Sequence, residues 1–341
     1  MAGAWQSDLL RTLIGGEDLS MDATRDLFNS IMDGELTEPQ IAAVLVALAA
    51  KGEAVDEIAG AATAMRAHAK KIDAGGRDVI DTCGTGGTGL KTLNISTAAG
   101  VVAAGAGACV AKHGNRSNTR PSGSAEVLAA LGVNIEAELD VVARCLAEAN
   151  ICFCFAILHH PAMRYAAPVR KGLGVRTIFN VLGPLTNPAG AKRQLMGVFE
   201  DELVETIAAV LGRLGSERAM VVHAEDGLDE ISISSPTHLA ELRDGKVKSR
   251  RVQPEDFGFR RASLEDLAVE SAEESAQRVR AVLAGERGPD RDVVLLNAAA
   301  ALAVADKAKD IKGGLVLAER SIDSGAASAA LDKLIEISKS A

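Results

Sequence analysis

Residues 78–97, DVIDTCGTGGTGLKTLNIST, mark the point at which the sequence changes from one pattern to another. A short apolar run containing Val79 and Ile80 enters a loop dense in glycine. Beyond it, apolar runs alternate with helical stretches, whereas the residues before it have helical patterns only. We therefore expect a small α-helical domain over residues 1–73 and a larger α/β domain over residues 74–341.

The N-terminal segment contains a well-marked helix over residues 37–52. Thr37 and Gln40 have the spacing of a capping box around Pro39, and Gly52 closes the run. Between them, apolar residues recur at helical spacing, as expected for one buried face. These are Ile41, Val44, Leu45 and Leu48.

The larger domain should contain a mostly parallel central sheet. Besides the short run near residue 79, the strand candidates are residues 108–111, 151–156, 194–199, 219–223 and 314–317. Residues 203–214 have helical spacing and fit a crossover helix between two parallel strands. Residues 241–252 alternate around an Asp-Gly turn and predict an exposed antiparallel hairpin. Residues 180–190, with two prolines and two glycines, predict an ordered loop.

Composition excludes several classes of protein. The formal net charge of -9 argues against a general binder of nucleic acid or anionic membranes, so any phosphate site must be local. The five cysteines form no CxxC pair and suggest a reducing, cytoplasmic setting. The first twenty residues lack the features of a signal peptide, and the apolar run 101–111 is too short and glycine-rich to span a bilayer.

The glycine-rich loop after residue 81 has the features of an anion cradle. Gly84 and Gly87, with the neighbouring glycines, leave backbone N–H groups free to converge, while Ser96 and Thr97 stand at an expected helix start. Taken alone, the cluster fits a tight strand-to-helix turn equally well. The spacing matches neither a Walker A loop nor GxGxxG.

A second loop, residues 111–124 (AKHGNRSNTRPSGS), also follows an apolar run. It gathers positive charge in an acidic protein through Lys112, His113, Arg116 and Arg120. Two such loops at strand ends suggest a ligand with two phosphate groups. Taken alone, Lys112 and Arg116 fit a solvated surface loop, and His113 fits a structural histidine.

Two further segments carry candidate chemistry. In residues 223–232 (HAEDGLDEIS), the adjacent carboxylates Asp229 and Glu230 suit magnesium if a phosphorylated ligand completes its shell, although an exposed acidic turn is the commoner outcome. Earlier in the chain, three side chains carry positive charge: Arg170, Lys171 and Arg176. An arginine there could bind a substrate carboxylate, or pair with an acidic residue on a helix.

Together these segments resemble the anthranilate phosphoribosyltransferase family, whose motifs occur in the same order through nearly the whole chain. GTGGT, NIST, KHGNR, SGSAE, VRKGLGVRTIFNVLGPLTNP and GLDE match the family patterns GTGGD, NxST, KHGNR, SGSAD, VRxxxGxRTxFNxLGPLxNP and GLDE. The resemblance implies a helical N-terminal domain hinged to an α/β domain of the nucleoside phosphorylase and phosphoribosyltransferase type, with a helical stretch near residues 160–185 packed on the N-terminal domain. It also implies a homodimer, a magnesium cofactor, and anthranilate and phosphoribosyl pyrophosphate as substrates.

The resemblance also assigns roles to individual residues. Lys112 and Asn115 become the expected catalytic residues, Gly84, Asn115 and Arg170 the anthranilate contacts, and Ser96, Asp229 and Glu230 the magnesium ligands. The expected contacts to phosphoribosyl pyrophosphate are Gly84, Gly87, Thr88, Thr92, Asn94, Ser96, Thr97, Lys112, Thr119, Arg120 and Ser124.

Two departures of the sequence from the family pattern matter for the site. Thr88 stands where the family has aspartate, which puts one magnesium or ribose contact in doubt. Residues 117–121 (SNTRP) replace a more serine-rich stretch, leaving Thr119 as a hydroxyl donor and adding the cation Arg120. Two rival functions remain at this point: a pyrimidine nucleoside phosphorylase, which leaves the carboxylate pair idle, and a non-catalytic relative that binds nucleic acid.

Overall fold

The N-terminal part of the chain is helical, as its pattern predicts. The computed structural model describes residues 4–117 and 122–340. Its first four helices are α1 (Ala4–Ile14), α2 (Met21–Met32), α3 (Glu38–Lys51) and α4 (Val55–Ala67). The backbone N–H of Thr37 donates to the side-chain oxygen of Gln40 at 2.9 Å, and α3 ends at Gly52. The four apolar residues predicted to face the core of this helix are all buried, which confirms the prediction.

A seven-stranded sheet forms the centre of the larger part of the molecule, in the spatial order β3-β2-β1-β4-β5-β6-β7. The strands are β1 (Val79–Asp81), β2 (Cys109–Gly114), β3 (Ile151–Phe155), β4 (Arg193–Gly197), β5 (Arg218–Ala224), β6 (Thr237–Arg243) and β7 (Lys246–Val252). The first five in spatial order pair in parallel. The mostly parallel sheet is therefore confirmed.

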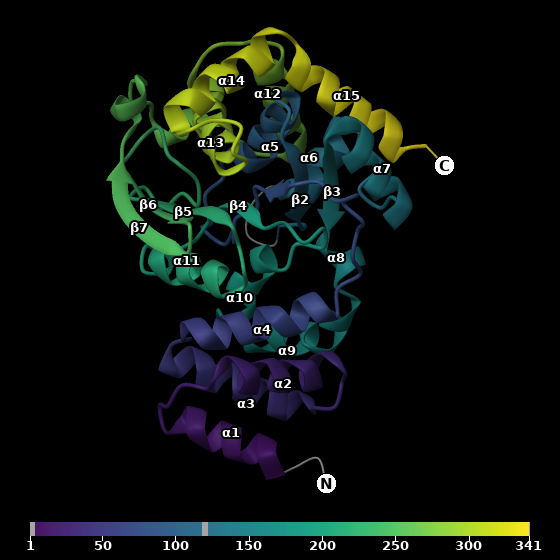
Figure 1. Ribbon diagram of the computed structural model, residues 1–341, viewed down its shortest axis with the longest axis vertical. Coiled ribbons are helices and arrows are strands. Elements are labelled where there is room, and N and C mark those ends of the chain that lie inside the picture. The colour runs from purple at the N-terminus through teal and green to yellow at the C-terminus, as the bar shows by residue number, and fades with distance from the viewer. Residues whose placement is uncertain (1–3, 118–121, 341) are drawn as a thin grey trace.

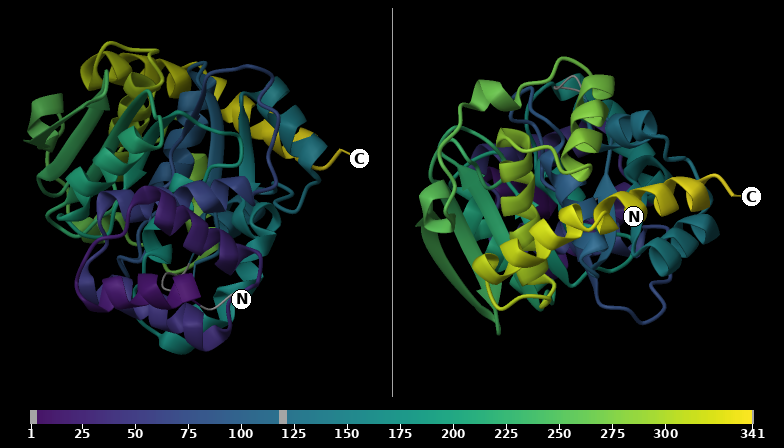
Figure 2. Two further views of the ribbon diagram at one scale, coloured as in Figure 1. Left: turned by 60° about the horizontal axis from the view of Figure 1, so that its bottom comes forward. Right: turned by 90° about the horizontal axis from the view of Figure 1, so that it is seen from above.

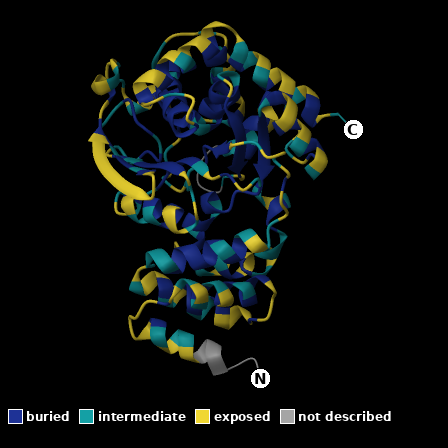
Figure 3. Ribbon diagram, in the orientation of Figure 1, coloured by how far each residue is buried: buried dark blue, intermediate teal, exposed yellow. Residues whose placement is uncertain are grey.

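The last two strands form the predicted antiparallel hairpin. The pairing runs from Arg243 opposite Lys246 to Thr237 opposite Val252. Asp244 and Gly245 join the strands with φ of 52° and 70°, values that suit the twist of a two-residue hairpin turn. All of β7 except Val252 is exposed, as Figure 3 shows.

Helices cover both faces of the sheet because side chains along a strand alternate between two cores. Leu195 and Met220 enter one core, which is shared with the helices above the sheet in Figure 1. Their neighbours Met196 and Val221 enter the other core. The helices of the first core are α5 (Ile95–Gly105), α6 (Ser124–Leu131), α7 (Leu139–Ala149), α12 (Ala272–Leu283), α13 (Pro289–Val304), α14 (Ile311–Asp323) and α15 (Ala326–Ser338).

The second core joins the sheet to the N-terminal helices. Figures 1 and 2 show α10 and α11 between the sheet and the N-terminal helical layer. The elements on this side are α8 (Ala156–His159), α9 (Ala167–Leu173), α10 (Phe179–Leu182) and α11 (Leu203–Arg213), with short 3-10 helices at Pro161–Tyr165 and Gly183–Leu185. Phe179 packs on Phe28 of α2 with 5.6 Å between ring centroids. The predicted crossover helix corresponds to α11, which connects the parallel strands β4 and β5.

Two predictions of local structure are wrong. Residues 314–317 form part of α14 rather than a strand, because Asp310 caps the helix by accepting the N–H of Gly313 and Val316 faces solvent. A short apolar run cannot by itself distinguish a strand from a helix. The predicted loop 180–190 is helical in its first half, where α10 and the 3-10 helix Gly183–Leu185 lie. Two further short 3-10 helices, Pro254–Phe257 and Leu264–Leu267, lie between β7 and α12.

The strand order determines where a ligand site can form. From β1 the chain builds the sheet outward through β2 and β3, and then returns to the other side of β1 with β4. The carboxyl ends of parallel strands share one edge, and a crevice opens where the direction of building reverses. We therefore expect the site at the carboxyl ends of β1 and β4. Among the helices described, none combines the length and the apolar composition that a membrane span requires.

Candidate active site

A pocket of about 350 Å³ lies at this edge of the sheet, and most of the residues proposed from sequence line it. These are Gly84, Gly87, Asn94, Ser96, Thr97, Lys112, Asn115, Ser124, Arg170, Asp229 and Glu230. Thr88 and Thr92 lie outside the lining residues. Thr119 and Arg120 fall outside the residues that the structure describes.

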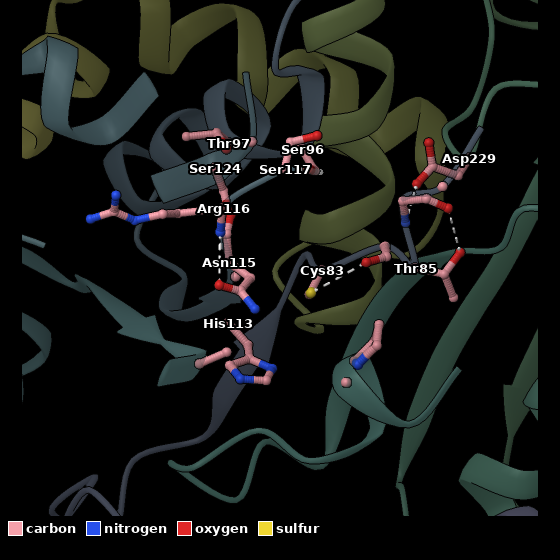
Figure 4. Close-up of a pocket in the computed structure, with 18 of the residues that line it drawn as sticks. Cys83, Thr85, Ser96, Thr97, His113, Asn115, Arg116, Ser117, Ser124 and Asp229 are labelled. Atoms are coloured by element: carbon pink, nitrogen blue, oxygen red, sulfur yellow. Dashed lines mark hydrogen bonds between the residues drawn. The ribbon is translucent and has the colours of Figure 1, made fainter. Parts of the chain in front are cut away.

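The pocket has two walls of different construction. The loop wall consists of residues from the loop after β1, from the end of β2 and from the start of α5 and α6: Gly84, Gly87, Asn94, Ser96, Thr97, Lys112 and Ser124. The arginine wall consists of residues of α9, α10 and the 3-10 helix that follows: Arg170, Phe179, Asn180 and Pro184. Figure 4 shows Asp229 and Thr85 on one side of the pocket, with Asn115, Arg116 and Ser124 on the opposite side.

The first glycine loop is held against the turn that carries Asp229. The Asp229 carboxylate accepts the Gly86 N–H at 2.9 Å, and the Gly197 carbonyl accepts the Thr85 N–H at 2.9 Å. A Cβ atom at Gly84 would lie 2.8 Å from the Asp229 carboxylate, and one at Gly197 would lie 1.7 Å from the Asp229 carbonyl oxygen. Glycine at both positions therefore lets the two segments meet.

This packing corrects the expectation of an exposed acidic turn. Asp229 is only 4% exposed, because the turn folds under the first glycine loop instead of extending into solvent. Glu230 is partly buried, and its Oε1 accepts the Ser96 N–H at 3.2 Å. Glu230 thus stands beside the N-terminus of α5, and Asp229 stands beside the first glycine loop. Together with the Ser96 hydroxyl they form a set of hard oxygen donors, the kind that magnesium prefers.

Lys112 places a buried positive charge at the base of the loop wall. Its side chain is 2% exposed, and Nζ donates to the Thr82 carbonyl at 3.2 Å and to the Ser96 hydroxyl at 3.3 Å. Burial raises the pKa of the nearby Asp81 to about 6, opposed by the charge of Lys112 and a hydrogen bond from Asn187. The Thr97 hydroxyl is also buried and has no hydrogen-bond partner among the described residues. An oxyanion in the pocket would satisfy such a hydroxyl.

The second loop begins later than the sequence suggested. Lys112 and His113 belong to β2 and are both buried, so the strand extends through the start of the basic motif. The His113 ring lies edge-on to His160, and burial lowers the pKa of His113, which supports the interpretation as a structural, neutral histidine. Arg116 is exposed and pairs with Glu136 at 3.5 Å, as expected of a surface cation.

The arginine wall presents the guanidinium group of Arg170 to the pocket. Arg170 lies over the ring of Phe179 at 5.2 Å from the centroid, and burial lowers the pKa of Arg170. Among the described residues no carboxylate forms an ion pair with it. The commoner outcome for an arginine on a helix, a pair with Asp or Glu, therefore does not occur here. A partly buried guanidinium beside an aromatic ring suits a planar ligand that carries a carboxylate.

Sequence reasoning missed two buried residues that support the loop wall. Ser275 of α12 donates to the Asn94 Oδ1 at 2.7 Å and accepts the Asn94 N–H at 3.2 Å. Asn297 of α13 bonds both the N–H and the carbonyl of Ile231, each at 2.9 Å, and thus fixes the residue that follows Glu230. The sequence does mark Asn297, because this polar residue interrupts an otherwise apolar run. Nothing in the sequence around Ser275 indicates its role.

Comparison with known proteins agrees with the motifs. Residues 76–328 match the α/β domain of a glycosyl transferase family, and residues 7–69 match the helical bundle domain of the same family. The anthranilate phosphoribosyltransferase of Methylococcus capsulatus is 50% identical over 97% of each chain. That of Thioalkalivibrio sulfidiphilus is 52% identical over 95% of this chain and 96% of its own.

Solved structures lead to the same family. The anthranilate phosphoribosyltransferase of Thermus thermophilus superimposes with a TM-score of 0.93 at 41% identity, covering 98% of this chain and all of the other. The enzyme of Saccharomyces cerevisiae, solved in complex with PRPP and Mg, gives a TM-score of 0.89 at 27% identity, covering 100% of this chain and 99% of its own. The chain therefore belongs to the anthranilate phosphoribosyltransferase family.

Proposed function

We propose that the protein transfers the phosphoribosyl group of 5-phosphoribosyl 1-pyrophosphate to the amine of anthranilate. The products are N-(5-phosphoribosyl)anthranilate and pyrophosphate, and the reaction is a step of tryptophan biosynthesis. One observation carries the proposal: a single pocket joins a wall of backbone N–H and hydroxyl groups to an arginine without an acidic partner among the described residues. These are the groups that a doubly phosphorylated donor and an aromatic carboxylate require.

We assign the loop wall to phosphoribosyl pyrophosphate and the arginine wall to anthranilate. The buried Lys112 ammonium and the Thr97 hydroxyl supply donors for phosphate oxygens. Gly84, Gly87, Asn94, Ser124 and the N-terminus of α5 complete this subsite in the proposal. Arg170 would pair with the anthranilate carboxylate while the Phe179 ring contacts the aromatic face. Asn115 of the second loop also lines the pocket.

The metal assignment follows from three oxygen donors that line the pocket. We propose that Ser96, Asp229 and Glu230 hold magnesium, with the substrate's phosphate oxygens and water completing its coordination. When bound, the ion would neutralise charge that accumulates on the departing pyrophosphate. The yeast relative was solved with PRPP and Mg, which supports this cofactor. The rival phosphorylase function would leave both carboxylates without a metal to bind.

The chemistry requires positioning more than a strong base. The bond between ribose C1 and the pyrophosphate oxygen breaks, and that oxygen keeps the electron pair. The anthranilate nitrogen forms a bond to C1 from the opposite face and then releases a proton to solvent. An arylamine is neutral and nucleophilic at pH 7, so the buried His113, whose pKa is lowered, is not needed as a base. Lys112 and the loop N–H groups stabilise the leaving group, and catalysis comes largely from alignment of the two substrates.

The decisive experiment follows anthranilate fluorescence in a mixture of protein, phosphoribosyl pyrophosphate and magnesium. We expect the fluorescence to fall only when all three are present, with pyrophosphate released in equal amount. A parallel reaction with pyrimidine nucleosides and inorganic phosphate tests the phosphorylase alternative, and a gel-shift titration tests nucleic-acid binding. Fluorescence that stays constant while either alternative gives a signal would overturn the proposal.

We also propose a cytoplasmic homodimer. All five cysteines are buried and free, in agreement with a reducing compartment. Sedimentation equilibrium at micromolar concentration would test the assembly, and a monomer mass at every concentration would contradict it.

A further inference from the structure

Arg176 lies just outside the pocket, between the two residues that define the arginine wall. It follows α9, which carries Arg170, and precedes α10, which begins at Phe179. Arg176 is not among the residues that line the pocket, and 48% of its side chain is exposed. Any effect on the reaction must therefore act through other residues.

The guanidinium of Arg176 contacts two separate segments at once. Its Nη2 donates to the Gly87 carbonyl oxygen at 3.0 Å, and its Nη1 donates to the Glu200 carboxylate. Its planar group lies over the Phe199 ring at 4.1 Å from the centroid. Phe199 and Glu200 follow the carboxyl end of β4, whereas Gly87 belongs to the first glycine loop. The face and two N–H groups of the guanidinium are thus occupied, which fixes its orientation.

The contact with Gly87 determines the direction of one peptide group in the loop wall. In a trans peptide the carbonyl and the following N–H point in opposite directions, and the chain has no cis peptide among the described residues. Arg176 therefore sets the plane of the peptide that joins Gly87 to Thr88. The two preceding residues are held from other segments, Thr85 by the Gly197 carbonyl and Gly86 by Asp229.

We propose that Arg176 is a positioning residue that couples the two substrate subsites, an inference that rests on the proposed function. Residues 170–176 form one short stretch of chain. It places Arg170 toward the carboxylate of anthranilate, and Arg176 toward the first glycine loop, which receives the pyrophosphate. A ligand that orders the first glycine loop also restrains the stretch that holds Arg170. Binding at one subsite consequently strengthens binding at the other, and by linkage the two enhancements are equal.

If Arg176 served only to stabilise the fold, its loss would not change the coupling between the two subsites. An exposed ion pair contributes little to stability. The Glu200 contact alone would therefore not change the affinity for either ligand. Lysine keeps the charge but cannot bond two acceptors with one planar group while lying on a ring. Arg176→Lys and Arg176→Ala should therefore behave alike. Glu200→Gln keeps the Gly87 and Phe199 contacts, and Lys171→Ala removes an exposed charge from the same stretch, so both serve as matched controls.

The test measures anthranilate binding by its own fluorescence, with magnesium alone and with magnesium plus inorganic pyrophosphate. Pyrophosphate carries no ribose, so no turnover occurs. In the wild-type protein we expect pyrophosphate to increase anthranilate affinity by at least about fivefold, a typical coupling. In Arg176→Ala and Arg176→Lys the increase should fall below about twofold, with melting temperatures close to wild type, while both controls keep the full increase.

Two results would overturn the inference: a wild-type protein without enhancement, or an Arg176→Ala variant that retains it. Failure of the proposed function has a different signature. The wild-type protein would then bind no anthranilate under either condition and would show no turnover with phosphoribosyl pyrophosphate.

Discussion

The two walls of the pocket differ in how their polar groups are satisfied. In the loop wall, protein atoms hold several polar groups in place: Asn94 accepts from Ser122 and Ser275, and the Ser96 hydroxyl accepts from Lys112, whereas the Thr97 hydroxyl has no partner among the described residues. In the arginine wall, Arg170 has an aromatic neighbour but no acidic partner among the described residues. Protein contacts thus hold much of the loop wall, whereas none of the described carboxylates pairs with the Arg170 guanidinium. Substitutions in and around each wall can test this difference.

The largest effect should come from the double variant Asp229→Asn with Glu230→Gln. The amide at position 229 can still accept the Gly86 N–H, so the loop should keep its place while the negative charge is lost. We expect turnover to fall at least about a hundredfold, the scale of losing a main electrostatic contribution. Turnover number and far-UV circular dichroism are the measurements. Near-normal activity at ordinary magnesium, in a folded protein, would reject the metal assignment.

A smaller and more selective effect is expected from Arg170→Ala. A charge-assisted bond to a carboxylate contributes about 1.5 to 3 kcal/mol, so the anthranilate KM should rise about tenfold to a hundredfold. Since Arg170 forms no ion pair with any of the described residues, the melting temperature should hardly change. Steady-state kinetics with each substrate varied in turn gives the two KM values. An unchanged anthranilate KM beside a raised KM for phosphoribosyl pyrophosphate would move Arg170 to the other subsite.

The supporting residue Ser275 should show the opposite pattern from Arg170. Ser275→Ala leaves the Asn94 N–H without its buried partner, at a cost of about 1 to 3 kcal/mol, while the Asn94 amide oxygen keeps the hydrogen bond from Ser122. We expect a lower melting temperature and a KM for phosphoribosyl pyrophosphate raised about threefold to tenfold, with little change for anthranilate. Differential scanning fluorimetry and the same kinetics check both parts. Equal changes in the two KM values would show that Ser275 acts on overall stability alone.

The smallest effect is expected at Thr88, where the sequence departs from the family pattern. The Leu90 N–H donates to the Thr88 hydroxyl at 3.4 Å, a contact that favours a capping role. Thr88→Asp would add a hard anionic ligand near the loop wall, and we expect the magnesium dependence of the rate to shift about twofold to threefold. Anthranilate KM should move little. Superimposable magnesium titrations with a lowered melting temperature would favour the cap and reject a metal role.

Local pattern was sufficient to predict the framework of the molecule. The apolar spacing of α3, the Asp-Gly turn between β6 and β7, and the position of α11 are local properties of the chain, and the structure confirms them. The motifs could also be placed together in advance, because loops that follow parallel strands meet at one edge. The prediction of a strand at residues 314–317 was wrong because so short an apolar run fits a strand and a helix equally well.

The packing around the site could not be predicted, since it depends on residues far apart in the sequence. Ser275 contacts Asn94 across 181 positions, and Asn297 contacts Ile231 across 66. No local pattern encodes such pairs. The burial of Asp229 likewise depends on contact with Gly86, which lies 143 positions away. A motif thus identified the chemical groups, while tertiary contacts decided which of them are held by the protein and which remain for a ligand.

The most direct test of the two-walled pocket is equilibrium binding of each substrate alone to wild type, Arg170→Ala and Asn94→Ala. Anthranilate is followed by its fluorescence and magnesium phosphoribosyl pyrophosphate by calorimetry. We expect Arg170→Ala to weaken anthranilate at least about tenfold and phosphoribosyl pyrophosphate less than about twofold, and Asn94→Ala to do the reverse. If both variants weaken the same substrate, or each weakens both substrates equally, the division of the pocket into two walls is wrong.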